Sequence, residues 1–152
     1  MDPFAALFAH ATPRARTFFA GTLCKTVQYP DVGHLHFLNG GKLTLVETGK
    51  SDLQVDEPTI LFFPRGRVHS FVVNPERGAD LVCATVELGG PEGNPIGQGL
   101  PELVVLPLAS HPALSPICNL VLREAFSEEG GRQEALNRLL DYLLILIVRH
   151  VV

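Results

Sequence analysis

Short β-prone segments separated by turns dominate the chain after residue 10 and up to about residue 88. Glycine- or proline-containing breaks such as Asn39-Gly40-Gly41 lie between them. Strands that recur every roughly 8–12 residues with such breaks are typical of a β-sandwich or a small β-barrel. This spacing therefore predicts a mainly β domain.

Helical periodicity is present on both sides of this β region. Residues 3–10 carry apolar side chains at helical spacing, which predicts a short N-terminal helix. A glycine- and proline-rich connection covers residues 89–101. Apolar residues then recur at helical intervals over residues 114–125 and again over residues 133–152. We therefore expect two C-terminal helices, which makes the fold class α+β.

The last predicted helix carries more apolar surface than one side of a small domain covers. It is apolar nearly all round between Leu143 and Val148. Such a helix is expected to be buried on more than one side. We therefore predict that this helix contacts a second partner surface.

Length and charge restrict the function of this domain. The 152 residues fit a single domain, and the net charge is -4. Because an acidic chain lacks the basic surface that neutralises phosphates, we expect no direct binding to nucleic acid. The start of the chain lacks a signal-peptide pattern, and its longest apolar run is far shorter than the roughly 20 residues of a membrane span. We expect a cytoplasmic protein without a membrane partner.

The segment FFPRGRVHSF contains the pattern Pro64-x-Gly66-x-x-His69. Proline and glycine shape a tight turn before a strand. Preceded by the H-x-H of His34 and His36, this turn resembles the cupin superfamily. Together with the start MDPFAALF and the strand LVCATVEL, nearly the whole chain is similar to the cupin-type N-terminal regulatory domain of AraC-family transcriptional regulators.

This resemblance implies one domain over residues 1–152 that senses an effector and dimerises. It implies a cupin-like double-stranded β-helix barrel with the short N-terminal helix over residues 1–100, and a helical dimerisation subregion over residues 101–152. The partners would be a small molecule or oxidant and a second copy of the chain. The interface with that copy would be formed by Leu136, Leu140, Leu143, Leu144 and Ile147. DNA would be bound only by a C-terminal pair of helix-turn-helix units that lies outside this chain.

The pattern departs from that of the enzymatic cupins. Those proteins usually carry a glutamate a few residues after H-x-H, whereas Gly40, Gly41 and Lys42 stand here and Glu47 is the first carboxylate. We therefore expect that the protein is not an enzyme. A stand-alone metal-dependent cupin that acts on a small molecule remains the alternative.

The implied barrel would bring inward-facing residues of distant strands together. Alternation places His34, His36 and Leu38 on one face of their strand, and Leu35 and Phe37 on the other. Two thiolates and two imidazoles would suit zinc, so one hypothesis assigns the metal ligands as Cys24, His36, His69 and Cys83. The same cysteines could sense an oxidant as thiolates. The simpler alternative is that both are small buried apolar residues and that the barrel holds an apolar pocket without metal.

The remaining candidate residues concern ligand binding and the core. His34 follows the turn at residues 31–33 and is expected at the barrel rim. Arg65 and Arg67 flank the turn before His69, where they would recognise an anionic effector or remain solvated loop charges. The three cysteines are an odd number, which argues against a disulfide scaffold, and Cys118 is expected in the helical core.

Overall fold

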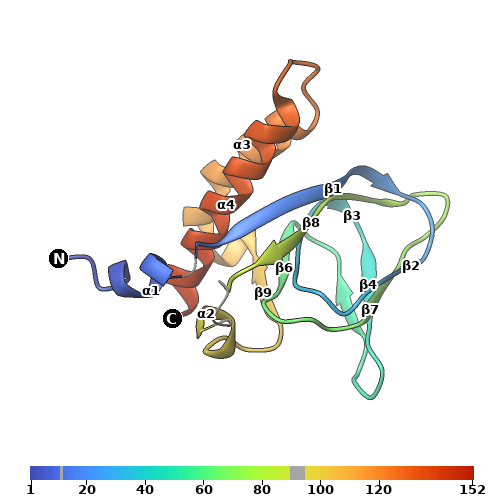
Figure 1. Cartoon of the computed structure of the whole chain (residues 1–152). Coiled ribbons are helices and arrows are strands. Elements are labelled where there is room, and N and C mark those ends of the chain that lie inside the picture. Colours follow the sequence, from blue (N-terminus) through green and yellow to red (C-terminus); the bar gives the residue numbers. More distant parts are fainter. Residues whose placement is uncertain (11, 90–94) are drawn as a thin grey trace.

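The computed structural model, which describes residues 1–10, 12–89 and 95–152, is a β-barrel with helices on one side (Figure 1). Its strands are β1 (Arg14–Leu23), β2 (Val27–Tyr29), β3 (His34–Gly41), β4 (Leu43–Val46), β5 (Leu53–Val55), β6 (Thr59–Phe63), β7 (His69–Val72), β8 (Ala79–Glu87) and β9 (Val104–Pro107). Its helices are α1 (Ala5–His10), α2 (Pro95–Gln98), α3 (Ser115–Ala125) and α4 (Arg132–Val151), with short 3₁₀ turns at Leu108–Ser110 and Pro112–Leu114. The predicted α+β class and the three predicted helical segments are confirmed.

The strands form two antiparallel sheets. The five-stranded sheet has the order β1-β8-β3-β6-β9, and the four-stranded sheet has the order β2-β7-β4-β5. Strand β3 lies at the centre of the larger sheet and pairs with β6 and β8. The H-x-H strand β3 and the strand β7 that follows the P-x-G-x-x-H turn therefore belong to opposite sheets.

Alternation along β3 separates two hydrophobic cores. Leu35 and Phe37 belong to the core shared with α3 and α4, whereas Leu38 belongs with Phe71 to the core between the two sheets. The predicted assignment of alternate residues to opposite faces is therefore confirmed for this strand. Because His36 has the parity of Leu38, its side chain points into the barrel.

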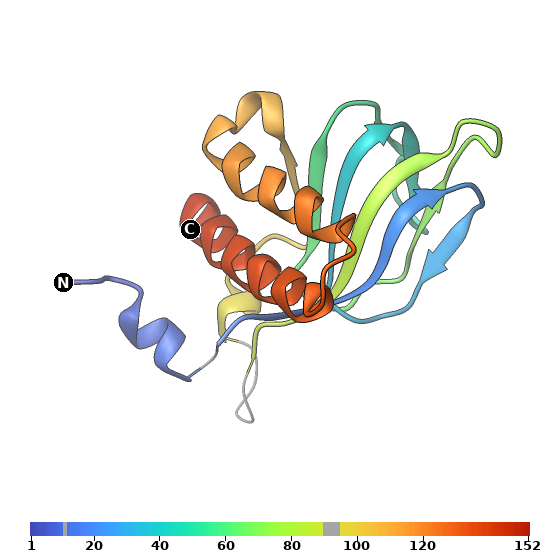
Figure 2. The ribbon, with the colours of Figure 1, turned by 90° about the horizontal axis from the view of Figure 1, so that it is seen from above.

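Helices α3 and α4 lie side by side against the larger sheet (Figure 2). Helix α4 packs on both β1 and α3, and Cys118 of α3 lies in the core beneath them, as predicted. The residues predicted to form the homodimer interface are instead at most 3% exposed within one chain: Leu136, Leu140, Leu143, Leu144 and Ile147. This placement is a correction, because the sheet and α3 of the same chain already cover that apolar surface.

Strand β9 extends the larger sheet past the expected end of the barrel. Residues Val104–Pro107 pair with Thr59–Phe63 of β6. The boundary predicted at residue 100 is therefore wrong for the sheet, because one more edge strand follows the connection. None of the described helices has the length and hydrophobicity needed to cross a membrane.

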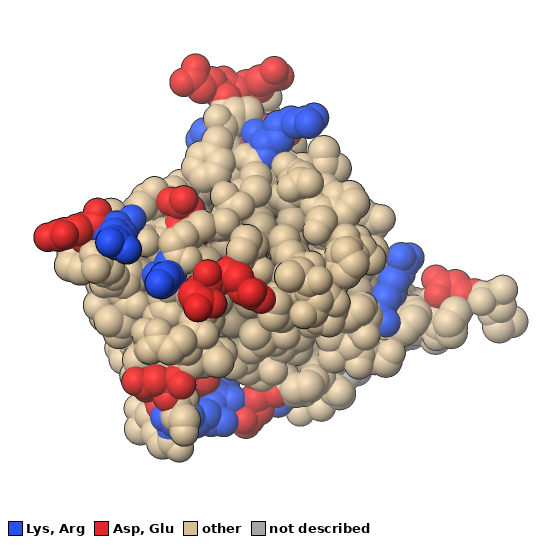
Figure 3. Space-filling model, turned by 180° about the vertical axis from the view of Figure 1, so that it is seen from behind, with Lys and Arg blue, Asp and Glu red and all other residues tan. Residues whose placement is uncertain are grey.

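Charged side chains of both signs lie near each other on the face seen in Figure 3. Ion pairs on the surface include Lys50 with Glu102, and Arg138 with both Glu134 and Asp141. This face is therefore mixed in sign, unlike the continuous basic surfaces that bind phosphate backbones.

Candidate functional site

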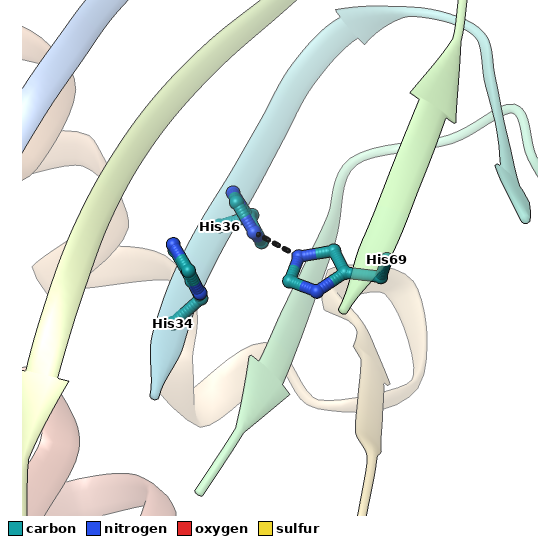
Figure 4. A group of neighbouring side chains, drawn as sticks. All are labelled: His34, His36 and His69. Carbon is teal, nitrogen blue, oxygen red and sulfur yellow. Dashed lines mark hydrogen bonds between the residues drawn. The ribbon is translucent and has the colours of Figure 1, made fainter. Parts of the chain in front are cut away.

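Three histidine side chains converge inside the barrel. His34 and His36 extend from β3, His69 extends from the start of β7, and the rings point toward one another (Figure 4). One ring nitrogen of each histidine lies within 4.8 Å of those of the other two. Their exposed fractions are 1%, 0% and 1%. This histidine group is a buried polar cluster, which requires compensating partners.

Backbone carbonyls determine which nitrogen carries the hydrogen in two of these rings. The Nδ1 of His34 lies 2.8 Å from the carbonyl oxygen of Val32, and the Nδ1 of His69 lies 2.8 Å from that of Arg67. A carbonyl only accepts hydrogen bonds, so each Nδ1 donates and each neutral ring keeps a lone pair on Nε2. Outer hydrogen bonds of this kind orient histidine ligands of metal ions.

His36 completes a donor set that fits a metal ion. Its Nε2 lies 2.9 Å from the Nε2 of His69, whereas its buried Nδ1 has no hydrogen-bond partner. Two nitrogens at this separation can both lie at roughly 2.0–2.1 Å, the usual zinc–nitrogen distance, from one ion. Imidazole ligands suit zinc, copper, iron and nickel. The three histidines therefore could bind a transition-metal ion.

Aromatic rings enclose the histidine group. The ring centroid of Tyr29 lies 5.5, 4.7 and 5.1 Å from those of His34, His36 and His69, and Phe63 stacks on His69 at 3.8 Å. Burial among these rings lowers the pKa of His36 and lowers the pKa of His69 to about 4. At neutral pH the imidazoles are therefore uncharged, and their lone pairs are available to a cation.

Cys83 lies beside the histidine group without belonging to it. It pairs with His36 across β3 and β8, and its side chain is fully buried and hydrogen-bonded to Tyr29. Burial raises the pKa of this thiol to about 12, which disfavours the thiolate needed for metal binding or oxidation. Among the described residues, the set of mutually close donor atoms contains histidines alone.

Cys24 is too distant from Cys83 for the predicted four-residue metal set. It is exposed and follows Leu23, which pairs with Ala79, whereas Cys83 pairs with Phe19. These two rungs are separated along β8 by about 13 Å at roughly 3.3 Å per residue. A disulfide requires Cα atoms within roughly 7 Å, so these two cysteines are too far apart to form one. Of the four predicted metal ligands, the structure brings together His36 and His69 but not the two cysteines.

His34 lies in the interior instead of at the predicted rim. Its ring stacks on that of His36 with a centroid distance of 5.3 Å, and Phe18 packs edge-on against it at 5.8 Å. The turn before β3 suggested exposure, whereas the neighbouring aromatic ring covers the histidine. The shared strand face of His34 and His36 was the sequence signal that could have identified His34 as a third donor.

Arg65 is occupied by contacts within the chain. Its guanidinium donates to the carbonyl oxygens of Gly97 and Leu100, which lie in and after α2. These bonds attach the turn before β7 to the connection that precedes β9. Arg65 therefore has a structural role here, and recognition of an anionic effector would compete with it.

Arg67 is likewise paired with carboxylates. Its guanidinium nitrogens lie 2.6 Å from a carboxylate oxygen of Glu47 and 2.7 Å from one of Glu102. The side chain of Glu47 is only 7% exposed. Glu47, the first carboxylate after H-x-H, therefore faces an arginine. In the described part of the chain, no carboxylate joins the histidine group.

Sequence reasoning missed Tyr29, which contacts all three histidines. Pro30 and Asp31 follow it, and this combination predicts a turn. In the structure Tyr29 is the last residue of β2 and pairs directly with His69 of β7. Only the pairing of these two strands, which are far apart in the sequence, places its ring over the site.

The chain was compared with family profiles, curated proteins and solved structures. The sequence profile of a family described as Cupin matches residues 2–152, and no curated protein matches the chain significantly. Two structures of ToxT from Vibrio cholerae superpose with TM-scores of 0.47 and 0.49, at 9% and 8% identity, over 91% and 93% of this chain. A ToxT structure bound to (E)-4-(8-methylnaphthalen-1-yl)but-3-enoic acid covers 93% at 8% identity with a TM-score of 0.41. The chain spans 55%, 57% and 58% of the length of these three structures.

Proposed function

We propose that this chain, which belongs to the cupin family, is the effector-sensing domain of an AraC-like transcriptional regulator. The profile match extends from the barrel through both C-terminal helices. The H-x-H strand and the P-x-G-x-x-H turn, which carry the resemblance to cupins, supply the three buried histidines. The convergence of His34, His36 and His69 is the observation that carries the proposal, and it makes this group the sensing site.

The sensing site would bind its ligand through imidazole nitrogens. Three protein ligands leave a coordination position open when they hold a metal ion such as zinc, and a small-molecule effector can bind there. The chain contributes the lone pairs of His34 and His69, oriented by backbone carbonyls, and an apolar surrounding. The oxidant alternative has less support, because burial raises the pKa of the Cys83 thiol to about 12.

We propose no catalytic role for the histidine group. The nearby carboxylate of Glu47 is paired with Arg67. Burial also raises the pKa of Tyr29 well above its usual value, so its hydroxyl retains its proton. Neither group is suited to act as a general base. A stand-alone metal-dependent cupin enzyme would use the same three histidines and is the alternative that turnover of a small molecule would favour.

The proposed regulator acts in the cytoplasm as a homodimer. A cleft of about 590 Å³ between α3 and α4 is lined by residues that include Leu120 and Leu139. Nearby, Phe126 and Tyr142 are 56% and 50% exposed. Exposed apolar side chains of this kind support a docking surface for a second copy. DNA would be bound by a part of the regulator outside this chain, which predicts two helix-turn-helix units encoded after Val152.

Metal binding by the purified chain tests the sensing site. After dialysis against a chelator, titration calorimetry with zinc is expected to show one ion per chain. His36→Ala is expected to weaken binding by more than the roughly 10–100-fold that is typical of outer-shell changes. Cys24→Ser is the control and is expected to bind zinc as the unchanged chain does, because Cys24 is exposed and outside the group.

Two outcomes would contradict this assignment. Unchanged zinc affinity in His36→Ala would place the metal elsewhere. A cobalt-loaded chain with a sulfur charge-transfer band that disappears in Cys83→Ser would show a cysteine ligand and would restore the mixed cysteine–histidine site.

A further inference from the structure

Helix α4 is hydrogen-bonded to the backbone of β1. The Ala15 N–H donates to the carboxylate of Asp141 at 2.6 Å, and the Thr17 N–H donates to Oδ1 of Asn137 at 2.9 Å. The side-chain amide of Gln133 donates to the carbonyl oxygen of Thr17 at 3.2 Å. Four helix residues rise by roughly 6 Å and two strand residues by roughly 6.6 Å. Polar side chains at every fourth helix position can therefore follow the free edge of the strand.

Strand β1 is irregular where these bonds end. Thr17 and Phe19 occupy consecutive rungs of the pairing with β8, which leaves Phe18 as a bulged residue. A bulge redirects the side chain it carries. The Phe18 ring lies with its centroid 5.8 Å from that of His34 and 6.1 Å from that of Tyr29, and it remains 49% exposed. The bulge therefore places an aromatic ring between the histidine group and solvent.

The same segment has room to rearrange. A cleft of about 180 Å³ is lined by Thr17 and Phe18 of the bulge and by Gln133 and Leu136 of α4, among others. The buried hydroxyl of Thr17 has no hydrogen-bond partner. Because buried polar groups are normally satisfied, the bonding at this joint is incomplete and a second arrangement could improve it.

We infer that the Phe18 bulge couples the histidine group to helix α4. The inference rests on the proposed sensing function and identifies how that site is regulated. A ligand seated against His34 displaces the Phe18 ring, and the shift of the adjacent Thr17 backbone alters its bond to Asn137. Coupling is reciprocal, so a change on α4 also alters the surroundings of His34.

The reciprocal direction can be tested without a ligand. In Asn137→Ala, the NMR resonances of the His34 imidazole and the Phe18 ring are expected to shift or broaden. The control is Glu134→Ala, an exposed change on the same helix that removes a contact to Arg138 and none of the contacts to β1. Asn137→Asp keeps the acceptor oxygen and is expected to restore the resonances, which a general loss of stability would not explain.

Zinc affinity provides a second test of the coupling. The chelator-treated chain and Asn137→Ala are expected to differ in zinc affinity by roughly 5-fold or more, the lower end of common coupling strengths. Equal affinities, or His34 resonances that are unchanged in Asn137→Ala, would overturn the coupling while the sensing site stands. Absence of zinc binding to the unchanged chain would count against the sensing site instead, and the NMR comparison would then decide the coupling.

Discussion

His69 combines three contacts that act on one imidazole. Its Nδ1 donates to the carbonyl of Arg67, its ring stacks on Phe63, and its Nε2 lies 2.9 Å from that of His36. The carbonyl favours the protonated ring, whereas burial opposes it more strongly, so the pKa falls to about 4. The position thus favours a neutral ring with a fixed orientation, which is the state a metal ligand requires.

The stability of the metal-free chain is expected to depend on pH because of this shift. The pKa of His69 falls from 6.5 to about 4 on folding, so between these values the unfolded chain binds a proton that the folded chain does not. The free energy of unfolding therefore rises with pH across this window, and the contribution of His69 reaches its full value above pH 6.5. The effect for His69 is up to about 3 kcal/mol. Urea unfolding in a chelator at several pH values measures it.

Two variants control for other titrating groups. His69→Gln removes the ring and is expected to reduce the pH dependence between pH 4 and 6.5 by the share of His69. The lowered pKa values of His34 and His36 keep the remaining part. Gln28→Asn, an exposed change on β2 that alters no titratable group, is expected to leave the slope unchanged. Equal unfolding free energies at both ends of the window in the unchanged chain would contradict the prediction.

At the scale of elements, two loops hold the histidine group. The turn before β7 lies directly against the loop before β3. The approach is so close that a Cβ added to Gly66 would be 2.5 Å from the carbonyl oxygen of Asp31. These loops also carry the carbonyls of Val32 and Arg67 that orient two of the histidines. The glycine of the P-x-G-x-x-H turn therefore permits a backbone contact that sets the relative position of β3 and β7.

Gly66→Ala is expected to separate these loops. The added methyl group meets backbone atoms that cannot move aside independently, so we expect a loss of about 1–3 kcal/mol, as in other overpacked sites. Displacement of the orienting carbonyls is also expected to weaken zinc binding by roughly 10–100-fold. Thermal unfolding and titration calorimetry measure the two effects.

Gly130→Ala is the matched control for this change. A Cβ there meets nothing within 4 Å, so stability and zinc affinity should both be retained. If Gly66→Ala bound zinc as tightly as Gly130→Ala does, the contact between the two loops would have no part in orienting the histidines.

For the whole molecule, α4 has one face packed against its own domain and another that is exposed. Leu143 is fully buried against the same chain, whereas the neighbouring Tyr142 is 50% exposed. Leu120 of α3 is 45% exposed and lines the cleft between the two helices. A dimer of folded chains would therefore use the outer side of α3 and α4. The buried leucine stripe of α4, which consists of Leu136, Leu140, Leu143, Leu144 and Ile147, stabilises each chain.

Charged substitutions are expected to separate these two roles. Tyr142→Glu should give a folded monomer in sedimentation velocity, because it places a charge in the proposed interface. Leu143→Asp should unfold the chain, because an unpaired charge cannot be buried without a large penalty. Gln28→Glu adds the same charge on the exposed side of β2 and should leave a dimer. A dimer that persists in both Tyr142→Glu and Leu120→Glu would exclude the α3–α4 surface.

The sequence by itself determined the properties that repeat locally. Alternation along β3 predicted that Leu35 and Phe37 oppose Leu38, and the two core clusters confirm this. Helical spacing predicted α1, α3 and α4, and the order of H-x-H and P-x-G-x-x-H indicated the family that the profile match supports. Such features were predictable because side-chain periods of 2 and 3.6 residues follow from backbone geometry alone.

Only the tertiary structure decided which surfaces and side chains meet. The leucine stripe of α4 is as apolar as a dimer interface, and the packing of β1 and α3 determines that it is core. The register of β1 on β8 separates Cys24 from Cys83, and the pairing of β2 with β7 places Tyr29 over His69. These outcomes depend on contacts between residues far apart in the chain, and the spacing of a single sequence carries no information about their register.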